Sequence, residues 1–201
     1  MPSRQQAIFA LSVLAVALAI AGAALYFASG KTGPMGSGEA LVGGPFSLTD
    51  HTGRRVSEKD YLGKYMLVFF GFTYCPDVCP TELQVMSAAL DELGPDGNVI
   101  QPIFVSIDPE RDTPEVIKQY VENFHPRLVG LTGSAEEIAA IARAYRVYYK
   151  KAPGAEADGS YEMDHSTIIY LMGPDGRFRK HFGYTTDAKA LAQGLREGIS
   201  N

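Results

Sequence analysis

Hydrophobic and polar residues follow one another along the chain in blocks that predict alternating strands and helices. Residues 66–72 and 103–107 are almost entirely apolar, and each run has the length of a strand buried in a parallel sheet. Between these runs, residues 81–93 carry apolar side chains three or four positions apart, the spacing of an amphipathic helix. The pattern therefore predicts two parallel strands joined by a helix.

Three more helices are predicted toward the C-terminus. Thr113 is an N-cap residue type followed by Pro114, and proline is favoured at the first helical position. Ser134 and Glu137 have the spacing of a capping box, which predicts the start of the next helix. The last helix is expected over residues 187–199.

Two hairpins complete the pattern. Residues 45–48 and 54–56 flank a turn and predict a hairpin at the start of the domain, and residues 167–172 and 177–182 flank the turn sequence GPDG. Strand, helix, strand and helix, followed by a hairpin and a helix, is the order of a thioredoxin-like fold. We therefore expect an α/β, thioredoxin-like (peroxiredoxin-related) domain with an N-terminal hairpin.

The N-terminal segment differs from the rest of the chain. Residues 7–28 form 22 positions without a charge, preceded by Arg4 and followed by Lys31. This stretch is long enough to span a bilayer and longer than the apolar core of a signal peptide. The alternative is a signal peptide that is cut after the small residues around 21–24. We predict a membrane anchor at residues 1–30, a Gly/Pro-rich tether at 31–44 and the globular domain at 45–201.

Charge bears on location and on partners. The basic side chain before the apolar segment favours an N-terminus inside the cell, which places a single-pass protein in the inner (cytoplasmic) membrane. The domain is then expected on the periplasmic or equivalent extracytoplasmic side, where disulfides persist. The net charge of −5 argues against nucleic acid as a partner.

The chain has two cysteines, Cys75 and Cys79, at the junction between the first buried strand and the following helix. Because proline disfavours helical geometry in the residue before it, Pro76 and Pro80 predict that both cysteines lie outside the helix. The helix is then expected to begin at Pro80, with Cys79 at the N-cap and Glu82 reaching back as in a capping box.

This placement makes reactive sulfur the expected chemistry. Free amides and the helix dipole lower the pKa of a thiol at a helix N-terminus, so Cys79 is expected to be the more acidic of the pair. A pair in this loop can close a disulfide or hold a soft metal between two sulfurs. The alternative is a structural disulfide, but such a short loop restricts the unfolded chain little. We therefore interpret Cys75 and Cys79 as redox-active or metal-binding.

His165 is the third candidate. A histidine at a loop–strand junction is usually structural, but in a thioredoxin-like fold the loop before the C-terminal hairpin lies beside the helix N-terminus that carries the thiols. His51, His125 and His181 lack that relation: His51 is in a turn, His125 precedes a proline and His181 lies within a predicted strand.

Four motifs in order along residues 43–200 resemble the Sco/SenC family. They are GGPFSLTD at 43–50, FTYCPDVCP at 72–80, SIDPERDTP at 106–114 and DHST at 164–167. Members of that family are membrane-anchored copper proteins that help to assemble the CuA centre of cytochrome c oxidase. The resemblance implies that Cys75, Cys79 and His165 are copper ligands, with one copper per chain. Two thiolates and an imidazole suit Cu(I), and Cu(II) also accepts them.

The resemblance implies partners as well. Cytochrome c oxidase subunit II, through its CuA domain, is the expected recipient of copper, and a copper donor protein and a thiol reductant are expected to load the site. The acidic residues at 108–112 belong to one of the motifs, and either face a partner or prepare the helix cap at Thr113.

The main alternative function is thiol–disulfide exchange, in which Cys75 and Cys79 reduce the cysteines of a target protein. The segment around Cys79 also resembles the peroxidatic-cysteine segment of peroxiredoxins, but Pro76 stands where those enzymes carry a threonine or serine, so peroxidase activity is not expected. A third alternative is an inert anchored domain with a structural disulfide, which would bind no metal.

Overall fold

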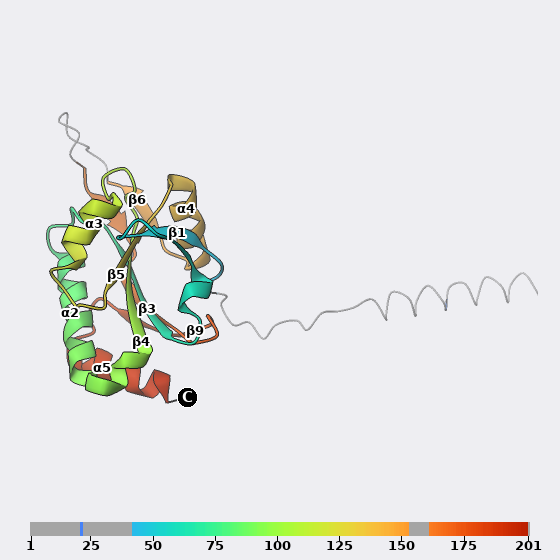
Figure 1. Ribbon diagram of the computed structural model, residues 1–201, viewed down its shortest axis with the longest axis vertical. Helices are drawn as coiled ribbons and strands as arrows, with labels where there is room; N and C mark the ends of the chain where they lie inside the picture. The colour runs from blue at the N-terminus through green and yellow to red at the C-terminus, as the bar shows by residue number, and fades with distance from the viewer. Residues whose placement is uncertain (1–20, 22–41, 153–160, 201) are drawn as a thin grey trace, which may run out of the picture. The chain divides into compact units, whose positions relative to one another are not determined.

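A mixed sheet of seven strands forms the centre of the domain (Figure 1). The computed structural model describes residues 21, 42–152 and 161–200. In spatial order the strands are β2 (Arg55–Ser57), β1 (Ser47–Asp50), β5 (Val129–Thr132), β4 (Ile100–Ser106), β3 (Tyr65–Gly71), β8 (Ile168–Met172) and β9 (Phe178–Gly183). β3, β4 and β5 are parallel, and the other strands pair antiparallel.

The two apolar runs in the sequence form the two central strands. β3 and β4 pair in parallel with Phe69 opposite Phe104, and both side chains are fully buried. Continuous apolar sequence is what a strand covered on both faces requires. The predicted parallel pair and both predicted hairpins, β1–β2 and β8–β9, are confirmed.

Among the described residues, four α-helices cover the sheet. They are α2 (Val78–Leu93), α3 (Pro114–Val121), α4 (Ala135–Ala144) and α5 (Ala188–Ile199), with two short 3-10 helices, η1 (Glu58–Tyr61) and η2 (Gly94–Val99). Figure 1 shows α2, α3 and α5 on one side of the sheet and α4 on the other. Right-handed crossovers explain this arrangement, because the chain runs from β3 to β4 to β5 in one direction and then returns across the sheet to β8.

The caps predicted for two helices are present. The Thr113 hydroxyl accepts a hydrogen bond from the backbone N–H of Val116 at the start of α3. Ser134 and Glu137 form both halves of the capping box of α4.

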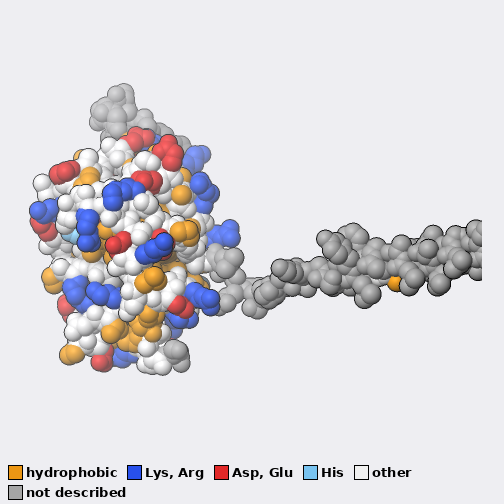
Figure 2. All heavy atoms as spheres, turned by 45° about the vertical axis from the view of Figure 1, so that its right-hand side comes forward, with side chains coloured by type: hydrophobic (Ala, Val, Ile, Leu, Met, Phe, Trp, Pro, Cys, Tyr) orange, Lys and Arg blue, Asp and Glu red, His pale blue; other side chains and the backbone are white. Residues whose placement is uncertain are grey.

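On the face of the domain shown in Figure 2, basic and acidic side chains are interspersed.

Three strands were not predicted. β5 is a four-residue strand that contains Gly130, and glycine is uncommon in strands. A Cβ atom at Gly130 would lie 2.1 Å from Ile117 of α3, so the glycine lets the helix approach the sheet. β6 (Tyr149–Lys151) and β7 (Met163–His165) form a separate two-stranded sheet.

The predicted anchor and tether at residues 1–30 and 31–44 lie almost entirely outside the described residues. In the part of the chain that the structure describes, no helix has the length and apolar character needed to cross a membrane.

Candidate metal centre

The helix that carries the second thiol begins earlier than the prolines predict. α2 starts at Val78 with Asp77 at the N-cap, so Cys79 is the second helical residue and the predicted start at Pro80 was wrong. The predicted capping box was also wrong, because Glu82 Oε2 is buried without a hydrogen-bond partner. Burial of Cys79 in the core overrides the local preference of a residue before proline.

The two thiols are free and adjacent at the N-terminal end of α2. Cys75 lies in the preceding loop and is half-buried, whereas Cys79 is fully buried. The backbone N–H of Cys79 donates a hydrogen bond to Cys75 Sγ over 3.3 Å. The pair is therefore held together while both sulfurs remain reduced.

The thiols differ in acidity, in the order opposite to the prediction. The hydrogen bond with the Cys79 side chain lowers the pKa of Cys75, with help from His165 and backbone N–H groups, although burial opposes the effect. The neighbouring Cys75 sulfur and burial raise the pKa of Cys79. The more acidic thiol is Cys75, because it keeps contact with solvent and receives the hydrogen bonds.

His165 ends β7 and faces the dithiol. β7 pairs antiparallel with β6, with His165 opposite Tyr149. The Nε2 atom of His165 lies 3.5 Å from Cys79 Sγ, and its Nδ1 atom lies 3.0 Å from the carbonyl oxygen of Ser166. When Nδ1 carries the proton and donates a hydrogen bond to that carbonyl oxygen, the lone pair of Nε2 points at the Cys79 sulfur.

Aromatic packing holds the imidazole ring. The His165 ring packs edge-to-face against two phenylalanine rings. The distance between ring centroids is 6.3 Å to Phe69 and 5.9 Å to Phe72. Both phenylalanines are buried, Phe69 within β3 and Phe72 directly after it. The core of the sheet therefore supports the imidazole from beneath.

The distance between sulfur and nitrogen suits a shared metal. With bonds of about 2.3 Å to sulfur and about 2.0 Å to nitrogen and a tetrahedral angle, the two ligand atoms lie about 3.5 Å apart. The described residues nevertheless contain no group of three His, Cys, Asp or Glu side chains that could hold a metal ion as it stands. Binding through Cys75, Cys79 and His165 together therefore requires an adjustment of the positions of these side chains.

A cavity of about 340 Å³ opens beside the thiols. Its lining combines the loop before α2 with the histidine strand, and it consists of Phe72, Cys75, Pro76, Asp77, Val78, Glu162, Met163, Asp164, His165 and Thr167. Cys75 and His165 both border this opening, so a partner can reach them from solvent.

The other histidines have structural roles. His51 Nδ1 accepts a hydrogen bond from the backbone N–H of Gly130, and His125 Nδ1 accepts one from the backbone N–H of Arg127. His181 lies in β9 and stacks on Phe178. None of these contacts involves a thiol.

The sequence left open whether the acidic residues at 108–112 face a partner or prepare the cap at Thr113. Asp108 and Asp112 are buried, at 2% and 0% exposure, and both bond within the domain. Glu110 is the exposed member. Asp108 and Asp112 therefore bond inside the domain, a role that the sequence did not indicate.

Comparison with known proteins assigns the chain. The profile of the SCO1/SenC family matches residues 34–200. The chain belongs to the SCO1/SenC family. The human mitochondrial protein SCO1 homolog is 56% identical over 151 residues, which cover 73% of this chain and 49% of the human protein. The chain thus spans about half the length of this relative.

Solved structures of Sco proteins share the fold. Arabidopsis thaliana ScoI with copper bound is 48% identical, with a TM-score of 0.75, over 79% of this chain and 98% of that one. BsSco, a member of the Sco family of cytochrome c oxidase assembly proteins in which a disulfide switch is identified, is 25% identical, with a TM-score of 0.64, over 80% and 94%. These relatives confirm the family and the thioredoxin-like α/β fold.

Proposed function

We propose that this SCO1/SenC chain is a copper metallochaperone that binds one copper ion through Cys75, Cys79 and His165. The observation that carries the proposal is the approach of His165 Nε2 to 3.5 Å from Cys79 Sγ, between residues 86 positions apart in the sequence. A shared metal is a chemical reason for bringing an imidazole to a dithiol.

The donor set suits copper better than zinc. Thiolate and imidazole ligands favour Cu(I) and are also accepted by Cu(II). A structural zinc site uses four protein ligands, and the sequence contains no third cysteine. Oxidation of Cys75 and Cys79 to a disulfide removes both sulfur ligands, so the redox state of the pair controls whether copper is bound.

The proposed recipient is the CuA domain of cytochrome c oxidase subunit II. Membership of the family supports this choice, since BsSco belongs to the Sco family of cytochrome c oxidase assembly proteins. A copper donor protein and a thiol reductant complete the cycle, because the site must be reduced before it is loaded. The proposed location is the inner membrane, with the domain on the extracytoplasmic side.

The test is copper binding by the reduced full chain and its variants. The parent is expected to bind one copper ion, and Cys75→Ser or Cys79→Ser to abolish tight binding. His165→Ala should weaken Cu(II) binding more than Cu(I) binding, because two thiolates still hold linear Cu(I). His181→Ala, an exposed histidine in β9, is the matched control and should bind as the parent does. Full retention of copper without both cysteines contradicts the proposal.

Thiol–disulfide exchange is the second candidate, and the lowered pKa of Cys75 favours it. Exchange requires a thiolate and no imidazole ligand, whereas copper delivery requires both. His165→Ala should therefore leave the reduction of a disulfide substrate largely intact and impair copper transfer to an apo CuA domain. Normal oxidase assembly by this variant at limiting copper would favour the reductase.

A further inference from the structure

The loop at residues 107–113, between β4 and α3, contacts both halves of the candidate metal centre. On one side it holds the cysteine segment through Asp112. Asp112 Oδ1 accepts a hydrogen bond from the Thr73 hydroxyl over 2.6 Å, and Oδ2 accepts one from the Thr73 backbone N–H over 3.1 Å. The Ser106 hydroxyl donates a third, over 2.6 Å. The backbone two residues before Cys75 is therefore tied to a buried carboxylate.

On the other side the loop holds the histidine segment through Tyr161, four residues before His165. The Tyr161 hydroxyl donates to Asp108 Oδ1 over 2.7 Å, and Arg111 Nη1 donates to the Tyr161 carbonyl oxygen over 2.9 Å. The guanidinium carbon of Arg111 lies 3.7 Å from the centroid of the Tyr161 ring. Arg111 Nε in turn donates to Asp108 Oδ2 over 2.5 Å, which closes the cluster.

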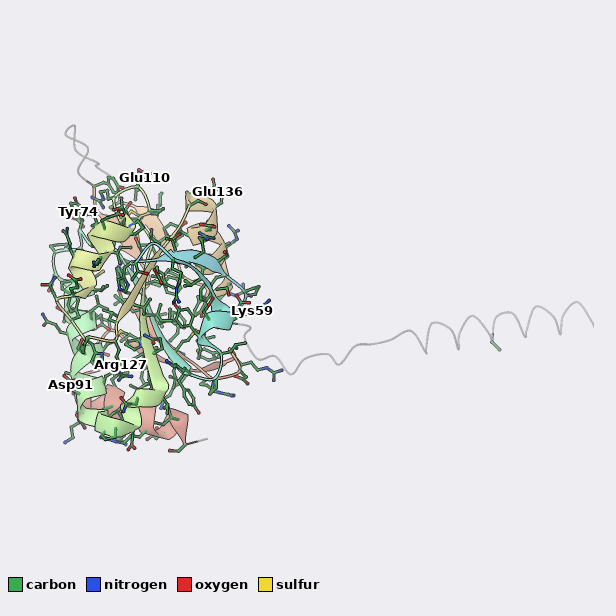
Figure 3. All side chains as sticks on the ribbon, in the orientation of Figure 1. Lys59, Tyr74, Asp91, Glu110, Arg127 and Glu136 are labelled. Carbon is green, nitrogen blue, oxygen red and sulfur yellow. The ribbon has the colours of Figure 1, made fainter. Side chains whose placement is uncertain are left out.

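Arg111 also reaches the cysteine side directly. Its guanidinium carbon lies 4.6 Å from the centroid of the Tyr74 ring, and Tyr74 precedes Cys75. A second cation, Lys151, lies 4.2 Å from the Tyr161 ring and forms an ion pair with Glu110 over 2.7 Å. Figure 3 shows Tyr74 and Glu110 at the same end of the domain.

The histidine strand needs such an external support. β6 and β7 pair through only three residue pairs, and a two-stranded ribbon of that length is marginally stable alone. Contacts of partly buried guanidinium with carboxylate and aromatic ring are stronger than those of exposed pairs. The side chain of Arg111 is 18% exposed and that of Asp108 is 1% exposed.

We infer that Arg111 and Asp108 are positioning residues, which set the distance of His165 from the dithiol by holding Tyr161. The inference rests on the proposed function, since it assigns to the loop the placement of the third copper ligand. Because linear Cu(I) needs only the two thiolates, loss of the support should affect Cu(II) most. Removal of an outer residue that orients a metal ligand costs about 10–100-fold in affinity.

The test compares Arg111→Gln and Tyr161→Phe with Arg179→Gln in the full chain. Arg179 pairs with Asp175 over 3.1 Å in the β8–β9 turn, at the far end of β8 from His165, so its variant loses an ion pair without touching the loop. Cu(I) and Cu(II) affinities are measured by chelator competition, and the Cu(II) site by its thiolate charge-transfer band and electron paramagnetic resonance. In the metal-free protein, hydrogen exchange is measured at the Ser166 amide, which donates to Tyr148.

Arg111→Gln and Tyr161→Phe are both expected to bind Cu(II) about 10–100-fold more weakly, with an altered spectrum. Both should keep their Cu(I) affinity within about threefold of that of the parent. Exchange at Ser166 should accelerate in both and stay unchanged in Arg179→Gln. Parent-like Cu(II) binding, or equal loss of Cu(I) and Cu(II), would overturn the inference. If the parent itself binds no copper, the proposed function fails, whereas the exchange rates still decide whether the loop positions His165.

Discussion

Single residues decide how closely the sulfurs can approach the sheet. Gly71 ends β3 beneath the dithiol, and a Cβ atom there would lie 2.8 Å from Cys79 Sγ and 3.0 Å from Phe104. Real Cβ atoms essentially never come within 2.8 Å of such a neighbour, so a side chain at this position must displace the sulfur of Cys79. The glycine at residue 71 thus leaves the space that the Cys79 sulfur occupies.

Gly71→Ala should destabilise the reduced protein by about 1–3 kcal/mol, the usual cost of overpacking a core, and weaken Cu(I) binding. Gly183→Ala is the matched control: Gly183 ends β9, and a Cβ atom there meets nothing within 4 Å. Urea unfolding and Cu(I) competition measure both effects. Equal behaviour of the two variants would show that Cys79 is not confined by Gly71.

The acidity of Cys75 gives a prediction about pH. Its lowered pKa keeps the thiolate present as pH falls, so its alkylation rate should change little between pH 8 and pH 6. An ordinary thiol of pKa about 8.5 loses about 75-fold over the same interval. Peptide mass spectrometry after iodoacetamide treatment identifies the modified residue, and Cys79 should stay unmodified in the folded protein.

Cys79→Ala tests the cause of this acidity. It removes the side-chain donor, and the hydrogen bond with the Cys79 side chain is the largest contribution to the lowered pKa of Cys75. The alkylation profile should then move toward that of an ordinary thiol. Faster modification of Cys79 than of Cys75 in the parent would contradict the order of acidity.

Among the elements, α2 contains a buried acid in its second turn. Glu82 is 1% exposed, and burial raises its pKa to about 7 from an ordinary 4.5. The folded state therefore holds this proton more tightly than the unfolded state does. The contribution of Glu82 to stability is most favourable below pH 4.5, is lost progressively as pH rises to 7, and is constant above that.

Glu82→Gln should remove this dependence, because a neutral side chain of the same shape carries no ionisation cost. At pH 8 the metal-free reduced variant should be more stable than the parent by about 2–3 kcal/mol, and at pH 4 the two should be equal. Glu92→Gln, on the exposed side of the same helix, is the control and should change stability by less than about 1 kcal/mol. Urea unfolding across pH 4–8 provides the measurement. If the parent gained stability relative to Glu82→Gln between pH 5 and pH 7, the raised pKa of Glu82 would be contradicted.

In the whole molecule, the described domain contains the candidate site, and the N-terminal segment is the predicted anchor. Residues 41–201 form one compact unit. The parallel strands β3 and β4 end at the same edge of the sheet, and from that edge run the cysteine loop and the loop that holds Tyr161. The candidate metal centre therefore lies at one end of the domain.

The uncharged segment at residues 7–28 predicts that the mature protein keeps its N-terminus and stays membrane-bound. Intact-mass measurement of protein extracted from membranes should give the full chain, and the fraction should resist washing with high salt. A mature chain that begins near residue 25–30 would identify the segment as a removed signal peptide.

Elements whose causes are local could be predicted from the sequence. Thr113, Ser134 and Glu137 cap their helices as predicted, because a cap depends on residues within three or four positions. The apolar runs of β3 and β4 correctly predicted buried parallel strands, because a strand covered on both faces needs apolar residues along its whole length. The cysteine spacing and the four motifs also sufficed to predict the SCO1/SenC family and the three candidate ligands.

Features that depend on burial and on contacts between distant segments became visible in the folded domain and not in the sequence. α2 starts at Val78 with Cys79 packed in the core, against the local preference of a residue before proline, and the hydrogen bond with the Cys79 side chain makes Cys75 the more acidic thiol. β5 formed around Gly130 because α3 packs against it, and strand propensity does not encode that approach. The contact of His165 with Cys79 likewise joins segments 86 residues apart, whose meeting depends on the free energy of the whole fold rather than on either segment alone.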